Sequence, residues 1–135
     1  MANPNIVNVT SIYGNTAYQI PSGTTVGTSW TYDGTTALTG LKPATGTVNR
    51  VTSVVVSNSY TSAVNASFAI SSNGTYGSGT AYYIANAISV PPNSSVIITD
   101  KTTSFYITEN QSIGAISGTT GGYLTFTVTF EAITS

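Results

Sequence analysis

The stretch Tyr123-Leu-Thr-Phe-Thr-Val-Thr-Phe-Glu-Ala-Ile133 carries the clearest pattern in this chain. Apolar and polar side chains alternate along it, which is the period of a β-strand with one buried face and one exposed face. The apolar set is Leu124, Phe126, Val128, Phe130 and Ala132. The opposite face holds a ladder of uncharged side chains, Thr125, Thr127 and Thr129. We therefore predict a core-building strand whose threonine face contacts water or a neighbouring subunit.

The composition of the whole chain also favours strands. Val, Ile, Thr and Tyr are abundant, whereas the usual helix formers Leu, Glu, Lys and Arg are scarce. Turn signals recur about every ten residues, a spacing typical of sandwiches and barrels. We predict an all-β fold in one domain over residues 1–135. It should be a single antiparallel β-sandwich, jelly-roll-like or Ig-like, with about eight to ten short strands and no substantial helix.

Residues 50–135 are predicted to form the core half of the sandwich. The expected strands before the last one are Arg50–Asn58, Val64–Ile70, Thr80–Val90 with a bend near Asn86, Ser95–Thr99, Phe105–Ile107 and Ser112–Ile116. The predicted core side chains are Val54, Val56, Phe68, Ile70, Ile97, Ile107, Leu124, Phe126, Val128 and Phe130. Consecutive strands of this length that pair with one another give an antiparallel sandwich.

Residues 1–49 are predicted to supply N-terminal strands and a long contact loop. The expected strands are Ile6–Tyr13, ended by Gly14 and Asn15, then Thr16–Ile20, and Val26–Tyr32 around Trp30. A turn at Asp33 and Gly34 then leads into a loop over Thr35–Asn49, and loops of that length are often contact arms. The predicted interface residues of this region are Trp30, Tyr32, Leu38 and Leu41, alongside Thr125, Thr127 and Thr129.

Charge is nearly absent from the sequence. Charged residues make up 5% of the chain, with a formal net charge of −1, against a norm of about 25%. Nucleic acid needs several Lys or Arg contacts to phosphate, and anionic membranes need a basic face, so neither is an expected partner. A neutral surface of Ser, Thr, Asn and Gly suits a protein that is packed into an assembly.

Catalytic and metal-binding residue types are also scarce. The chain has no Cys and no His, which removes the commonest general base and the soft zinc ligands. A two-carboxylate hydrolase would need a pair such as Asp100 and Glu109, or Asp33 and Glu131, in a cleft. We interpret Asp100 and Glu109 instead as solvated residues of turns. We expect a protein that is not an enzyme, with no catalytic residues, no cofactor and no metal.

Aromatic residues raise one alternative, which is sugar binding. Trp30 and the nine tyrosines stand on a scaffold rich in Ser, Thr and Asn, with Tyr82, Tyr83 and Tyr106 as candidates for stacking on a sugar. Tyrosines in sandwiches are more often half-buried, with the ring in the core and the hydroxyl at the rim. Adjacent residues of a strand point to opposite faces, so Tyr82 and Tyr83 cannot share one platform.

The order of strands and turns from Arg50 to Ile133 resembles small virion proteins of tailed bacteriophages. The matching pieces are Val54–Asn58, Val64–Ile70, Val90–Ile98 with its Pro-Pro-Asn-Ser-Ser turn, Phe105–Ile113 and Tyr123–Ile133. The resemblance implies a β-sandwich structural component, either a head decoration (cement) protein or a part of the neck or tail. The expected partners are other copies of this chain, in a trimer, and virion proteins such as the major capsid protein.

The resemblance also implies a place in the virion after synthesis in the host cytoplasm. The N-terminus Met-Ala-Asn-Pro-Asn-Ile has no basic region followed by an apolar run, so we expect no signal peptide. The alternative function is a neck, tail or fibre-associated module that binds a host glycan or receptor.

Overall fold

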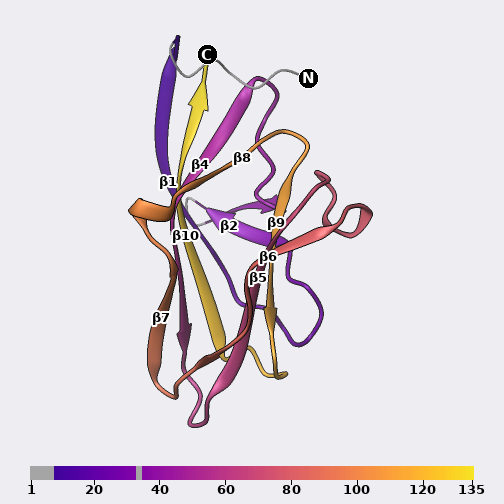
Figure 1. Ribbon diagram of the computed structural model, residues 1–135, viewed down its shortest axis with the longest axis vertical. Coiled ribbons are helices and arrows are strands. Elements are labelled where there is room, and N and C mark those ends of the chain that lie inside the picture. The colour runs from indigo at the N-terminus through magenta and orange to yellow at the C-terminus, as the bar shows by residue number, and fades with distance from the viewer. Residues whose placement is uncertain (1–7, 33–34) are drawn as a thin grey trace.

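Ten strands and two single-turn 3-10 helices form the regular structure of residues 8–32 and 35–135, the part of the chain that the computed structural model describes (Figure 1). The strands are β1 (Ser11–Gln19), β2 (Ser29–Tyr32), β3 (Thr36–Thr39), β4 (Thr47–Asn58), β5 (Val64–Ser71), β6 (Ala81–Val90), β7 (Ser94–Thr99), β8 (Phe105–Ile107), β9 (Ser112–Ser117) and β10 (Leu124–Thr134). The 3-10 helices are η1 (Tyr76–Ser78) and η2 (Lys101–Thr103). The predicted all-β fold is confirmed.

Two antiparallel sheets pack face to face. The large sheet has the order β3-β2-β1-β10-β4-β7, and β8 shares the edge of β4 with β7. The small sheet has the order β6-β5-β9. In Figure 1 the long strands β1, β10 and β4 run side by side, and β5, β6 and β9 form the second layer. Two packed antiparallel sheets are a β-sandwich.

Strand pairing is nested from the outermost strands toward the middle of the chain. β1 pairs with β10, and Gly27 bridges β9 at Ala115. Farther inward, β4 pairs with β7 and β5 pairs with β6. This pairing is that of one long hairpin folded over into two sheets, which is the jelly-roll arrangement. The structure therefore selects the jelly roll from the two sandwich types that the sequence allowed.

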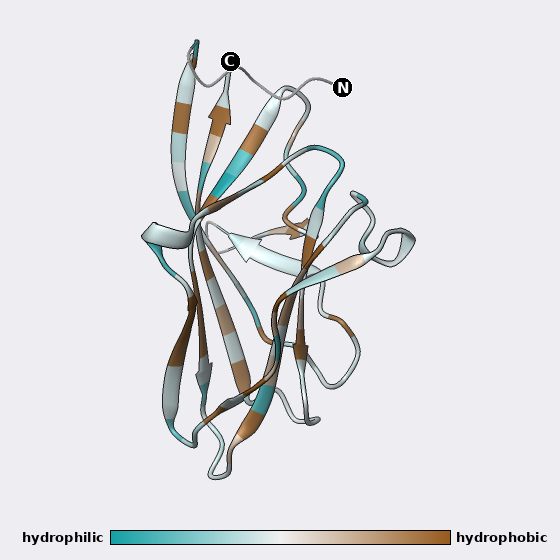
Figure 2. Ribbon diagram, viewed as in Figure 1, coloured by the Kyte–Doolittle hydropathy of each residue, from teal (hydrophilic) through white to brown (hydrophobic). Residues whose placement is uncertain are grey.

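The core lies between the two sheets, and β10 faces it from the middle of the large sheet, between β1 and β4. Figure 2 shows apolar and polar bands alternating along β10, as its sequence predicts. The buried predicted residues are Val54, Val56, Phe68, Ile107, Leu124, Phe126, Val128 and Phe130, and Ile70 is half-buried against them. Phe68 joins the two layers, since its ring lies 6.5 Å from that of Phe126 and 6.2 Å from that of Trp30. Burial of rings of this size supplies much of the free energy of folding.

Ile97 was predicted in the core, and the structure shows that this prediction is wrong. Its side chain is 66% exposed. In the run Val96-Ile97-Ile98 all three side chains are apolar, so the sequence does not show which of them points toward the core. The register pairs Ile97 with Val55 across an irregularity in the β4–β7 ladder, and this turns Ile97 toward the outside of the large sheet.

The N-terminal strand boundaries also differ from the prediction. Gly14 and Asn15 do not end a strand, because β10 supplies partners for both, Glu131 and Phe130, and β1 continues to Gln19. Ile6 and the turn at residues 33 and 34 lie outside the described residues. The predicted loop over Thr35–Asn49 is wrong, since β3 pairs with β2 and β4 begins at Thr47. Residues 40–46 form the remaining loop.

Trp30 and Leu41 were predicted at an interface, and both are instead fully buried in the core. The Trp30 indole donates a hydrogen bond from Nε1 to the Ile113 carbonyl oxygen at 3.2 Å, and the Gly40 carbonyl oxygen accepts from the Ile113 amide at 2.8 Å. Gly27 exchanges two backbone hydrogen bonds with Ala115, at 2.7 and 3.0 Å. These contacts cover the outer edge of β9, which would otherwise present unpaired backbone groups. The interface prediction is therefore wrong for both residues.

Candidate interaction face

One row of paired residues crosses the large sheet on the side away from the core. Going from β3 to β7, the row is Ala37, Thr31, Tyr18, Thr127, Val55 and Ile97. Every member of this row is exposed or half-buried, whereas Phe126 and Val128 beside Thr127, and Val54 and Val56 beside Val55, are buried. We call the surface around this row the outer face.

The predicted threonine ladder lies on the outer face. Thr125, Thr127 and Thr129 are half-buried between the neighbouring strands. Thr125 pairs with Ser57, and Thr129 pairs with Ser53. The centre of the outer face is thus a field of short hydroxyl side chains beside Val55 and Ile97. That a partner covers this ladder stays a prediction.

Within the strands that form the outer face, charge is confined to one pair. The strands of the large sheet contain two charged residues, Arg50 on β4 and Glu131 on β10, which are partners in the register. Arg50 Nη1 lies 3.8 Å from Glu131 Oε2, and both side chains are about one-third exposed. An ion pair of this exposure contributes about 0–1 kcal/mol to stability. The two opposite charges cancel, so the strands of the outer face carry no net charge.

A hollow of about 410 Å³ lies on this face beside the β4–β7 irregularity. Its lining brings together Asp100, Lys101 and Glu131, a grouping that differs from the carboxylate pairs considered from the sequence. Asp100 caps η2, because its Oδ1 accepts from the Thr102 amide at 3.0 Å and from the Thr102 hydroxyl at 2.6 Å. These hydrogen bonds hold the pKa of the Asp100 carboxyl below its usual range. Asp100 therefore has a structural role as a cap.

The position of Glu109 in a turn predicted a solvated side chain, and this prediction is wrong. Its side chain is 5% exposed, and Oε1 accepts a hydrogen bond from the Gly46 amide at 2.6 Å. Among the described residues Oε2 has no hydrogen-bond partner. The carboxylate thus fastens the turn before β9 to the loop before β4. Nothing in the local sequence Thr-Glu-Asn-Gln signals this burial, since Gly46 is distant in the chain.

The aromatic residues considered for sugar stacking do not form one platform. Trp30 is in the core. Tyr82 and Tyr83 are exposed on β6, where they pair with Ile70 and Ala69, two neighbours that point to opposite faces of β5. Tyr106 lies on the other sheet, opposite Arg50. The expectation that Tyr82 and Tyr83 point to opposite faces agrees with this register.

Tyr32 and Leu38, the other two predicted interface residues, are half-buried and lie away from the threonine ladder. Both pack against the core and line a hollow of about 270 Å³ with Pro43 and Phe130. The structure thus divides the seven predicted interface residues into three groups. Two are in the core, two line this hollow, and the three threonines are on the outer face.

Comparison with known proteins leaves the family open. The chain matches no protein-family model, and no curated protein or solved structure matches it either. Within residues 8–32 and 35–135, His, Cys, Asp and Glu do not form a group of three that could hold a metal ion. The same residues include no helix that is long and apolar enough to cross a membrane.

Proposed function

We propose that this chain is a structural protein of a tailed-phage particle, a capsid decoration protein that acts as a closed oligomer and stabilises the head shell. The observation that carries the proposal is the outer face, a broad sheet surface without net charge. The phage-like order of strands and turns from Arg50 to Ile133 supports it. The jelly-roll fold adds support by analogy, since viral capsid proteins and lectins use it, although a fold by itself does not define a function.

The part of the outer face over β10, β4 and β7 is suited to a second copy of this chain. Burying an ion costs several kcal/mol, whereas a hydroxyl needs a hydrogen bond. Short Ser and Thr side chains also lose little conformational entropy when they are covered. Ile97, 66% exposed, adds apolar area at the edge of the field. Because this surface carries no net charge, it meets a neighbouring copy without repulsion, which favours self-association over binding to a charged partner.

Two measurements test the proposal separately. Mass spectrometry of purified particles tests the location, and absence of the chain from the particles would contradict it. Size-exclusion chromatography with light scattering tests the oligomer, for which we expect three times the chain mass of 13.9 kDa. A monomer at high protein concentration would contradict self-association.

A matched pair of variants tests which face is used. Ile97→Lys places a cation beside the hydroxyl field, so we expect a monomer. Ile84→Lys is the control, because Ile84 is also exposed, at 42%, but lies on β6 of the small sheet. The assignment of the outer face is contradicted if Ile84→Lys dissociates the oligomer and Ile97→Lys does not.

A further inference from the structure

The connection between β5 and β6 contains the one Asn-Gly pair of the sequence, Asn73-Gly74. Asn73 is exposed, and Gly74 beside it is half-buried. The side-chain carbon Cγ of an asparagine can be attacked by the backbone nitrogen of the next residue, which closes a small unstrained ring. Glycine hinders this attack least, because it has no Cβ. The contacts around the pair decide whether the fold favours or blocks the reaction.

The peptide group that joins Asn73 to Gly74 is prepared to act as the nucleophile. Its carbonyl oxygen accepts a hydrogen bond from Ser112 Oγ at 2.7 Å, and Ser112 is fully buried. A hydrogen bond polarises the groups that it joins, so this contact stabilises the negative charge that a deprotonated amide places on its oxygen. Among the described residues the Gly74 N–H has no hydrogen-bond partner. The attacking nitrogen is therefore not held by another contact.

The side-chain amide of Asn73 is prepared to act as the electrophile. Its Oδ1 accepts a hydrogen bond from the Thr75 amide at 2.8 Å, and such a donor stabilises the negative charge that develops on oxygen when a nucleophile adds to the carbon. Its Nδ2 donates to no described group, so it is free to leave. Lys42 packs on the glycine, since a Cβ added to Gly74 would lie 3.0 Å from Lys42 Cε. This contact brings a cationic side chain against the reacting peptide.

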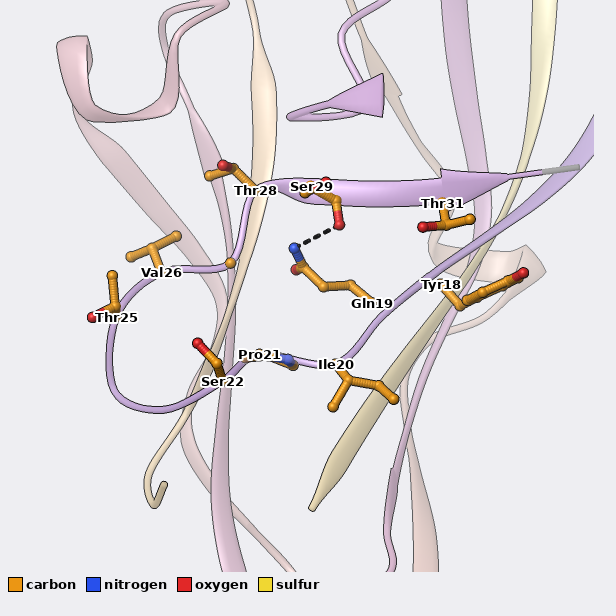
Figure 3. Close-up of a pocket in the computed structure, with 11 residues that line it drawn as sticks. Tyr18, Gln19, Ile20, Pro21, Ser22, Thr25, Val26, Thr28, Ser29 and Thr31 are labelled. Carbon is orange, nitrogen blue, oxygen red and sulfur yellow. Dashed lines mark hydrogen bonds between the residues drawn. The ribbon is translucent and has the colours of Figure 1, made fainter. Parts of the chain in front are cut away.

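Other side-chain amides of the chain are locked by the fold. Asn58 is 3% exposed, and its Nδ2 donates to the Val90 carbonyl oxygen at 3.0 Å. The N–H of Ser59, which would have to attack it, is engaged in a backbone hydrogen bond of 2.9 Å. In Figure 3 the Gln19 amide is likewise turned onto Ser29, whose carbonyl oxygen accepts from Nε2 at 3.0 Å. Asn73 lacks these restraints.

We propose that Asn73-Gly74 is a self-modification site at which the asparagine converts to aspartate and isoaspartate. The Gly74 nitrogen loses its proton to hydroxide and bonds to Asn73 Cγ. The bond from Cγ to Nδ2 then breaks, and the leaving nitrogen takes a proton from water and departs as ammonia. Water adds to the resulting succinimide and opens it. Opening at one carbonyl carbon gives aspartate, and opening at the other gives isoaspartate, whose main chain runs through the former side-chain carbon.

The modification changes both the charge and the backbone of the connection. It adds one negative charge to a chain whose formal net charge is −1, next to Lys42. Isoaspartate also lengthens the main chain at the point where Ser112 of β9 holds the β5–β6 connection. The reaction needs no second copy of the chain and does not involve Ile97 on β7. This proposal and the proposed self-association can therefore fail independently.

Incubation of the purified protein at mildly alkaline pH, followed by peptide mass spectrometry, tests the proposal. We expect a mass increase of about 1 Da at Asn73, because NH₂ is exchanged for OH, while Asn58 stays unchanged. The rate should rise with pH, since the Gly74 nitrogen must lose its proton. The proposal is overturned if Asn73 is intact after a period in which the same chain, unfolded in urea, has converted. Conversion of Asn58 as fast as that of Asn73 also overturns it.

Variants test the contacts that surround the pair. Ser112→Ala removes the hydrogen bond to the Asn73 carbonyl oxygen and should slow the conversion by about two- to tenfold. Gly74→Ala places a methyl group against the flexible end of Lys42 and should also slow it. Gly77→Ala is the matched control in the same connection, because its methyl group meets no atom within 4 Å, and it should convert as the wild type does. Unchanged rates in both Ser112→Ala and Gly74→Ala overturn the proposal.

Discussion

Substitution of Trp30 separates a core role from an interface role more sharply than any other change in this chain. The indole is fully buried, contacts the Phe68 ring edge-on at 6.2 Å, and donates to the Ile113 carbonyl oxygen. Trp30→Ala should cost about 3–5 kcal/mol for the cavity, and the unpaired carbonyl adds about 1–3 kcal/mol. Trp30→Phe keeps a ring against Phe68 and should cost about 2 kcal/mol, mainly for the lost hydrogen bond. Small domains are stable by about 5–15 kcal/mol, so Trp30→Ala removes a large share.

Urea unfolding measures these losses of stability. Far-ultraviolet circular dichroism follows the backbone, so the signal does not depend on the tryptophan that is replaced. With an m value of about 2 kcal/mol per molar, Trp30→Phe should lower the midpoint by roughly 1 M. Tyr82→Ala is the control, because Tyr82 is 62% exposed, and it should stay within about 0.5 kcal/mol of the wild type. The core assignment is refuted if Trp30→Ala unfolds at the wild-type midpoint and instead dissociates an oligomer.

Three further predictions concern local contacts. Gly114→Ala places a methyl group 2.6 Å from a valine methyl of the β1–β2 connection. It should lower the free energy of unfolding in urea by about 1–3 kcal/mol. The control is Gly77→Ala, whose methyl group meets no atom within 4 Å and should not destabilise the protein by overpacking. Glu109→Ala leaves a partly buried backbone amide unpaired and should cost about 1–3 kcal/mol, while Glu109→Gln keeps an acceptor and should unfold close to the wild-type midpoint. For Asp100, whose pKa is lowered by hydrogen bonds from Thr102, the stabilisation is present above the unfolded pKa and is lost as pH falls through the folded pKa. An NMR titration should show the lowered pKa in the wild type and a rise toward the ordinary value in Thr102→Ala, and equal values would contradict the capping role.

The two edges of the small sheet suggest how the sandwich controls its own assembly. The backbone groups of Ile113 and Ala115 at the β9 edge are occupied by Gly27, Trp30 and Gly40. At the other edge, β6 carries exposed Tyr82, Tyr83 and Ile84 and an irregular register against β5. Ala87 adopts a positive φ of 52° in this strand, so the bend expected near Asn86 is present. An irregular edge is less able to add a strand from another chain.

The sequence by itself determined the fold class and the central strand. From Leu124 to Phe130 the alternation is strict, and the period of two is a property of the extended backbone, so the buried face follows from local chemistry. It ends there, because Ala132, which the pattern places on the buried face, is half-buried and Ile133 is buried instead. The same reasoning placed Phe68, in the alternating run Val64–Ile70, and the structure buries it. Near Ile97 it failed, because three successive apolar residues do not show which one turns outward.

Tertiary structure alone decided the remaining features, because each depends on a partner that is distant in the chain. Trp30 is buried because β9 offers a carbonyl oxygen, and Glu109 is buried because Gly46 offers an amide. β1 continues through Gly14 because β10 pairs with it there. The Gln19 amide packs directly on Gly27, which is hydrogen-bonded to Ala115 of β9. A pattern read along the chain has no access to these pairings, which arise only when the two sheets close.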